Sequence, residues 1–163
     1  MSEWHNPTAA ERLEIITNTS SVAIVGMSAD PGRASYFVAT YLLSSSCSFE
    51  HVWFVNPKGG EILGRPVYPS LAELPGVPDL VDVFRRADQL PAVAEEFIAI
   101  PGTRTFWAQL GLYSAEAVEI VTNAGRTAVM NRCLKIEHAR FCGGLHLAGF
   151  DTGVISSTRR PLL

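Results

Sequence analysis

Short, largely apolar runs recur along the chain, separated by longer segments in which apolar residues return at helical spacing. The runs cover residues 22–25, 52–55, 80–84, 105–110, 127–130 and, more weakly, 66–68. Apolar runs of this length are typical of strands that are buried on both faces of a parallel sheet. The pattern therefore predicts five or six strands.

Helical spacing fills the intervening segments. Residues 36–43 carry apolar side chains on nearly every face, and apolar residues recur at helical spacing over 90–98, where Asp88 is the expected cap. Residues 114–122 show the same spacing, and Gly125 is placed to end that helix. The chain thus alternates strands with helices.

One further helix is expected before the first strand, over residues 8–17, where Thr8 and Glu11 form a candidate capping box. Strands that alternate with helices imply right-handed crossovers and a sheet covered on both faces. We therefore expect the α/β class: a single Rossmann-like three-layer domain over residues 1–163, with a mostly parallel sheet of five or six strands. Residues 143–163, rich in Gly and Ser, are expected to form a tail.

Composition narrows the class of protein. A chain of 163 residues that is 47% hydrophobic can bury one substantial core. The net charge of −3 disfavours nucleic acid and membrane surfaces as partners. We find neither a run of transmembrane length nor a signal-peptide pattern at the start. The three cysteines are odd in number and lack metal-type spacing, which indicates a reducing, cytoplasmic environment.

The end of the first strand carries the most informative motif. Gly26 matches the first glycine of the dinucleotide-binding pattern, in which a tight turn leads into a helix whose amides face a phosphate. Ser28 stands where the second glycine would be, and Pro31 replaces the third. The turn therefore predicts a phosphate-bearing ligand but does not identify it.

Basic residues follow several of the predicted strands. Five of the 13 Lys and Arg residues do so: Arg33, Lys58, Arg85, Arg86 and Arg132. Ligands of open parallel sheets bind outside the carboxyl ends of the strands, so this distribution favours an anionic ligand there. The alternative is that Arg33 and Arg86 are solvated charges at helix starts.

The end of the second strand discriminates between nucleotides. NAD-binding domains place an acidic residue there to hold the ribose hydroxyls, whereas this chain has Asn56-Pro57-Lys58 followed by two glycines. Lys58 favours a phosphorylated ribose, either the 2′-phosphate of NADP or the 3′-phosphate of coenzyme A (CoA). The alternative is that Pro57 and the glycines build a turn that leaves Lys58 exposed.

Few residues suggest catalysis. His138 lies in a mixed helical stretch and is expected at the surface or in a cap, and Asp79 and Asp82 are expected to be satisfied carboxylates at the edges of a strand. Cys133 follows Arg132 at a strand end, where a cation could lower the pKa of a thiol. The alternative for Cys133 is a small buried apolar side chain.

The chain also resembles a known family, the small stand-alone CoA-binding proteins called YccU-like or CoA-binding domain proteins. Five motifs carry the resemblance, in this order: Gly26-Met27-Ser28, Val55-Asn56-Pro57, Val81-Asp82-Val83-Phe84-Arg85, Phe106-Trp107-Ala108-Gln109-Leu110-Gly111 and Asn131-Arg132-Cys133-Leu134-Lys135-Ile136-Glu137. The family is similar to the N-terminal domain of the succinyl-CoA synthetase α subunit. The resemblance covers residues 15–140. The family commonly has Asp where this chain has Asn131, so no role is assigned to that position.

The resemblance implies a CoA site at the strand ends. Gly26 and Ser28 would meet the pyrophosphate with Arg33 nearby, and Asn56, Pro57 and Lys58 would flank the adenosine and its 3′-phosphate. The other implied contacts are Val83, Phe84 and Arg85 along the nucleotide, and Trp107 and Gln109 in a deeper pocket.

The expected function is therefore binding of CoA or an acyl-CoA by a non-catalytic module that acts as a carrier or sensor. An enzyme is not favoured, because the phosphohistidine domain and nucleotide-grasping subunit of related CoA ligases have no counterpart in these residues. Two alternatives remain: an NADP-dependent oxidoreductase, and a redox protein in which Cys133 forms a mixed disulfide with CoA.

Overall fold

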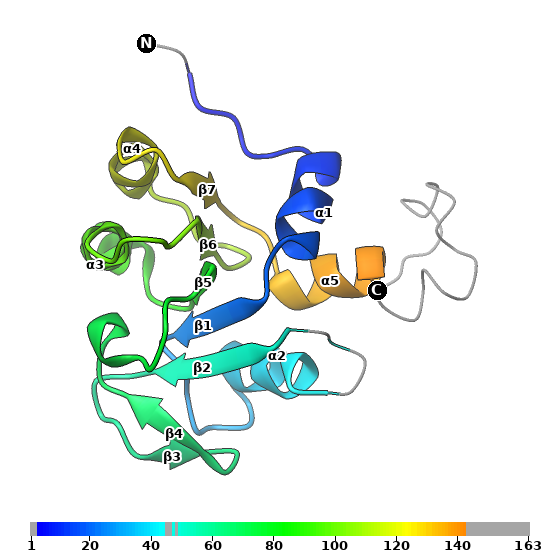
Figure 1. Ribbon diagram of the computed structural model, residues 1–163, viewed down its shortest axis with the longest axis vertical. Coiled ribbons are helices and arrows are strands. Elements are labelled where there is room, and N and C mark those ends of the chain that lie inside the picture. The colour runs from blue at the N-terminus through cyan, green and yellow to red at the C-terminus, as the bar shows by residue number, and fades with distance from the viewer. Residues whose placement is uncertain (1–2, 45–46, 48, 143–163) are drawn as a thin grey trace.

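Seven strands form one sheet in the order β3-β4-β2-β1-β5-β6-β7 (Figure 1). The strands are β1 (Ser21–Val25), β2 (His51–Val55), β3 (Glu61–Ile62), β4 (Arg65–Tyr68), β5 (Leu80–Val83), β6 (Thr105–Ala108) and β7 (Thr127–Val129). Every pairing is parallel except that of β3 with β4. The expected mostly parallel sheet is confirmed. It gains β3, whose two residues are too short to leave a periodic pattern.

This computed structural model describes residues 3–44, 47 and 49–142. The tail expected over 143–163 lies outside the described residues. None of the helices in the described part of the chain is both long and apolar enough to cross a membrane.

Five α-helices cover the sheet: α1 (Ala9–Thr17), α2 (Ala34–Leu42), α3 (Leu90–Ile98), α4 (Ala115–Asn123) and α5 (Leu134–Cys142). Helices α3 and α4 lie on one face, and α1, α2 and α5 lie on the other (Figure 1). Two short 3₁₀ helices, Leu71–Glu73 and Ala87–Gln89, stand in the loops before β5 and α3.

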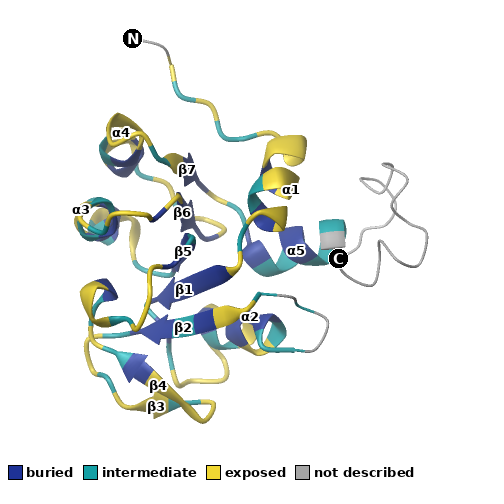
Figure 2. Ribbon diagram, viewed as in Figure 1, coloured by how far each residue is buried: buried dark blue, intermediate teal, exposed yellow. Residues whose placement is uncertain are grey.

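The strand residues divide between two hydrophobic cores because successive side chains of a strand point to opposite faces. In β1, Ala23 and Val25 pack against the α3–α4 layer, whereas Val22 and Ile24 pack against the α1–α2–α5 layer. All five residues of β1 are buried, as Figure 2 shows for the centre of the sheet. The continuous apolar runs in the sequence reflect this burial on both sides.

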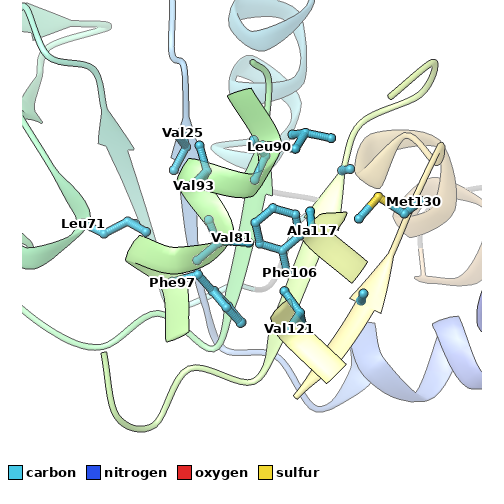
Figure 3. Close-up of a cluster of buried hydrophobic side chains, with 14 of the residues drawn as sticks. Val25, Leu71, Val81, Leu90, Val93, Phe97, Phe106, Ala117, Val121 and Met130 are labelled. Atoms are coloured by element: carbon cyan, nitrogen blue, oxygen red, sulfur yellow. The ribbon is translucent and has the colours of Figure 1, made fainter. Parts of the chain in front are cut away.

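The α3–α4 core is built around aromatic and branched side chains (Figure 3). The rings of Phe97 in α3 and Phe106 in β6 meet edge to face, with centroids 5.5 Å apart. This arrangement is favourable because the positive edge of one ring faces the negative face of the other. The packing anchors β5 and β6, whose carboxyl ends reach the candidate site.

Side-chain caps are present at the starts of α1 and α4, but the cap expected at the start of α3 is not. Thr8 and Glu11 form the expected capping box of α1. Ser114 caps α4 by accepting a hydrogen bond from the amide of Ala117. The expected cap at Asp88 is wrong: Gln89 is the N-cap of α3, and the Asp88 carboxylate pairs with Arg86 at 3.3 Å instead.

Candidate functional site

A cavity of about 960 Å³ lies at the carboxyl ends of β1, β2, β5 and β6. Eight residues expected at a ligand site line it: Gly26, Ser28, Arg33, Asn56, Lys58, Phe84, Arg85 and Gln109. These residues come from four strand ends that are far apart in sequence and adjacent in the sheet. The sheet therefore brings most of the expected site together.

Gly26 lines the cavity at the end of β1. Its φ is +88°, and a Cβ built at this position would overlap the carbonyl oxygen of Phe84. The amides of Gly26 and Met27 both donate to the carbonyl oxygen of Val55, at 3.0 and 3.2 Å. Only glycine fits at this position, because the backbone is left-handed and the end of β5 presses against it.

Short polar side chains shape the loop from Gly26 to α2. The amide of Ser28 donates to Ser35 Oγ, and Ser28 Oγ accepts from the amide of Asp30, both at 3.0 Å. Asp30 Oδ1 in turn accepts from the amide of Gly32 at 2.9 Å. Arg33 is the N-cap of α2, yet its side chain makes no capping hydrogen bond. The loop is organised internally, while the start of α2 has no side-chain cap.

Asn56 ties the ends of β1 and β2 together. Its Nδ2 donates to the carbonyl oxygen of Met27 at 2.8 Å, and its Oδ1 accepts from the amide of Lys58 at 2.9 Å. The Asn56 carboxamide is thus occupied by the protein backbone. Lys58 is exposed at the cavity rim, beside Gly59 and Gly60.

The end of β5 contributes one braced cation. Arg85 Nε donates to Gln89 Oε1 at 2.9 Å, and both residues line the cavity. Arg86 also lines it and is ion-paired with Asp88 on the exposed surface. Asp30 and Glu61 are the acidic residues among the described lining, against four cations. The cavity is therefore more basic than the chain as a whole.

The end of β6 supplies an unusual acceptor. Gln109 is 7% exposed, and its Oε1 is buried without a hydrogen-bond partner among the described residues. The adjacent loop is held from β7, because Asn131 Oδ1 accepts from the amide of Gly111 at 2.7 Å. Asn131 takes a φ of +59° to do this. Leu110 and Leu112 of this loop line the cavity.

Four residues expected near a ligand lie elsewhere. Val83 and Trp107 are fully buried in the two cores, and Trp107 Nε1 donates to the carbonyl oxygen of Arg132 at 2.9 Å. Pro57 is exposed and, like Arg132, is not among the cavity-lining residues. Val83 and Trp107 lie within β5 and β6, whose side chains point into the cores, whereas Phe84 and Gln109 just beyond these strands line the cavity.

Three other expectations need correction or restriction. His138 is buried, at 1% exposure, and not at the surface. Asp82 lies within β5 without a hydrogen-bond partner among the described residues, and burial raises the pKa of its carboxyl well above the ordinary value. Cys133 is 8% exposed in the α1–α2–α5 core and does not line the cavity.

Asp79 behaves as expected of a satisfied carboxylate. Burial alone would raise its pKa, but hydrogen bonds from the Ser20 amide and Arg104 outweigh that effect and lower it. The Arg104 pair measures 2.9 Å. Among the residues that the structure describes, no three His, Cys, Asp or Glu side chains are placed to hold a metal ion.

The sequence analysis assigned no role to several residues that shape the cavity. Met27 supplies the carbonyl that Asn56 holds, Gln89 braces Arg85, and Asn131 holds the loop of Leu110 and Leu112. Asn131 carried one usable signal: asparagine tolerates a left-handed backbone better than most residues. The other contacts join residues whose pairing depends on the tertiary structure.

Comparison with known proteins agrees with this geometry. Residues 20–139 match the model of the CoA binding domain family. The chain is 41% identical to the uncharacterized protein YneT of Bacillus subtilis, over 82% of this chain and 96% of that protein. A hypothetical protein from Pyrococcus horikoshii OT3 has a solved structure with a TM-score of 0.77 and 34% identity, covering 88% of this chain and 100% of that one.

A larger protein shares the domain. The α subunit of the ADP-forming acetate–CoA ligase I of Pyrococcus furiosus is 38% identical over 88 residues, which are 52% of this chain and 19% of that subunit. The family model matches most of this chain, and the alignment with YneT covers nearly all of that protein. These two matches establish the family. The chain belongs to the CoA-binding domain family and is related to the CoA-binding domains of ADP-forming acetyl-CoA synthetases.

Proposed function

We propose that this chain binds CoA or an acyl-CoA in the cavity at the strand ends, as a carrier or sensing module. The observation that carries the proposal is the gathering of four cations, Arg33, Lys58, Arg85 and Arg86, around one cavity of a chain whose net charge is −3. CoA is a polyanion with phosphates at two places along its length. A cavity lined by cations from three strand ends suits such a ligand.

The pyrophosphate is assigned to the start of α2. A helix N-terminus presents amides without intrahelical partners, and Arg33 at the N-cap makes no side-chain hydrogen bond to them. A phosphate there would accept hydrogen bonds from the helix amides and charge-assisted bonds from Arg33. The glycine turn at Gly26 lets the ligand approach the backbone closely.

The 3′-phosphate is assigned to Lys58. Its amide is held by Asn56 Oδ1, which fixes the backbone of the turn while the side chain stays exposed at the rim. Gly59 and Gly60 follow with φ of +65° and +90°, a backbone that leaves room for a ribose phosphate. Asn56 itself serves as a positioning residue, since both ends of its carboxamide bind backbone.

The pantetheine arm is assigned to the end of β6. Gln109 Oε1 is a buried acceptor without a partner among the described residues, and leaving it unpaired is costly. The amide N–H groups of pantetheine are donors of the right kind. Leu110 and Leu112 would contact the methylene groups between them. A mixed disulfide through Cys133 is not part of this proposal, because that thiol lies in the core.

Calorimetry with CoA, NADP and NAD tests the proposal. All three ligands carry a pyrophosphate, CoA and NADP add a ribose phosphate, and only CoA carries a pantetheine arm. We expect CoA to bind more tightly than NADP, and NADP more tightly than NAD. Binding of NADP at equal or higher affinity than CoA would contradict the assignment and favour an oxidoreductase.

A further inference from the structure

A cysteine, a histidine and a tyrosine meet at the end of the molecule opposite the cavity. Cys47 precedes β2, so it lies at the amino ends of the strands, whereas the cavity lies at their carboxyl ends. Cys47 Sγ is 3.7 Å from His138 Nε2, and Tyr41 Oη is 2.8 Å from His138 Nδ1. Three segments, the end of α2, the approach to β2 and α5, therefore converge on one imidazole.

The surroundings hold this imidazole in place. His138 is 1% exposed, and the ring of Phe49 packs edge-on against it with centroids 5.3 Å apart. The Tyr41 ring also meets it edge-on, at 5.5 Å. Cys47 is half-buried, whereas His138 is buried. The cluster thus joins a closely packed imidazole to a half-buried cysteine.

Two charged residues of α5 precede His138 in sequence. Lys135, one turn before His138 in α5, places its ammonium 5.6 Å from the centre of the Tyr41 ring. Glu137, the neighbour of His138 in sequence, is committed to a buried ion pair with Arg12 at 2.8 Å. Burial lowers the pKa of His138, so the imidazole is neutral at physiological pH and can accept a proton. In the tautomer that carries its proton on Nδ1, this N–H donates to the Tyr41 oxygen and Nε2 is the acceptor that faces Cys47.

We propose that Cys47 is a nucleophilic thiol, with His138 as its base and Tyr41 as the positioning residue, and that it exchanges with low-molecular-weight disulfides. A nucleophile within reach of a base that a third group orients is the arrangement that activates cysteine in proteins. This site is separate from the proposed CoA cavity and does not depend on it.

The exchange balances without a further reactant. The Cys47 thiol transfers its proton to His138 Nε2, and the thiolate attacks one sulfur of the disulfide. The bond between the two small-molecule sulfurs breaks as the Cys47 mixed disulfide forms. The leaving thiolate takes the proton from the imidazolium. The Cys47 sulfur is oxidised, and the leaving sulfur is reduced.

The test uses dithiodipyridine, a neutral disulfide, on full-length protein in which Cys133 and Cys142 are both serine. Cys47 is then the only thiol, because the chain has three cysteines. The release of pyridinethiol is measured from pH 5 to about pH 10.5, so that the profile extends beyond the midpoint of an ordinary thiol at about 8.5 or higher. Limited access to the sulfur scales the rate at every pH but leaves the midpoint of the profile unchanged. We expect a midpoint about one to two pH units below that of N-acetylcysteine, as for other thiols paired with imidazole.

Two variants distinguish a His138 that acts as the base of Cys47 from a His138 that only packs against it. His138→Gln is expected to move the midpoint up to that of N-acetylcysteine, and to slow the reaction at pH 7 about tenfold, because an ordinary thiol is only a few per cent ionised there. Tyr41→Phe keeps the ring and removes the hydroxyl, and it is expected to raise the midpoint by a smaller amount. Peptide mass spectrometry of the wild-type protein should find the adduct on Cys47.

One variant serves as the control, and one result would overturn the proposal. Cys47→Ser should abolish release in the single-thiol protein and leave CoA affinity unchanged. A midpoint equal to that of N-acetylcysteine in the parent protein would overturn the proposal. If His138→Gln does not fold, the parent profile and Tyr41→Phe still decide, since an unchanged midpoint in Tyr41→Phe would remove tyrosine from the mechanism.

Discussion

The carboxamide of Asn56 donates to the carbonyl oxygen of Met27 at 2.8 Å and thereby joins the ends of β2 and β1 at the mouth of the cavity. The same side chain accepts from the amide of Lys58. One residue therefore sets the spacing between the turn assigned to the pyrophosphate and the turn assigned to the 3′-phosphate. This link is the physical basis for testing the two phosphates separately.

Lys58→Ala should weaken CoA binding about tenfold while leaving dephospho-CoA binding nearly unchanged. The lost interaction is one exposed, charge-assisted contact, so its contribution lies near the lower end of the range for hydrogen bonds to charged groups, and about 1.4 kcal/mol corresponds to tenfold. Calorimetry with both ligands measures the difference. An equal loss for the two ligands would show that Lys58 contacts something other than the 3′-phosphate.

Arg33→Ala should weaken CoA and dephospho-CoA by the same factor, about tenfold, because the pyrophosphate is common to both ligands. Arg86→Ala is a matched control: Arg86 lines the same cavity, but its guanidinium is paired with Asp88. We expect a smaller loss in that variant. A selective loss of CoA binding in Arg33→Ala would reverse the assignment of the two phosphates.

Gly26→Ala should destabilise the fold by about 1–3 kcal/mol, because it strains a left-handed backbone and drives a methyl group into the Phe84 carbonyl. Gly60→Ala is the control. Gly60 has a similar φ, +90°, but nothing lies within 4 Å of the place that an alanine methyl group would take. Urea denaturation of both variants measures the contribution of the steric overlap. Equal losses would mean that backbone strain alone accounts for the effect.

Asp82→Asn should stabilise the protein at pH 7 by about 1–3 kcal/mol, because it removes a buried carboxyl without a partner among the described residues. The pKa of Asp82 is raised in the folded state, so the wild type loses stability as pH rises from about 3.8 through the folded pKa. The gain in Asp82→Asn should therefore shrink as pH falls towards 3.8. Urea titrations across this range measure it, and a gain that does not depend on pH would show that ionisation of Asp82 is not its cause.

Asp79→Asn should act in the opposite direction. Hydrogen bonds lower the pKa of Asp79 in the folded state, so its contribution to stability is present above the unfolded pKa of about 3.8 and is lost as pH falls through the folded value. The variant should be less stable than wild type at pH 7, by about 1 kcal/mol for an exchange at a partly exposed site. The difference should vanish in strong acid. Stability equal to wild type at pH 7 would show that Arg104 and Ser20 do not hold the carboxylate in solution.

Much of the fold could be predicted from the sequence because its signals are local. The apolar runs of β1 and β5 reflect burial on both faces, and the capping box at Thr8 involves residues only three positions apart. The strand β3 could not be predicted, since two residues carry no period. The cap predicted at Asp88 was wrong because Asp88 lies within the short 3₁₀ helix Ala87–Gln89, so that the N-cap position of α3 falls on Gln89.

The candidate site divides in the same way. The sequence by itself determined that glycine, serine and cations follow the strands, and parallel topology then places them at one edge. The tertiary structure decided which of them face the cavity: Trp107 lies within β6 and points into a core, whereas Gln109 lies just beyond the strand end. Only the tertiary structure could bring Cys47 next to His138, 91 positions away, because contact at that separation depends on how α5 packs across the sheet.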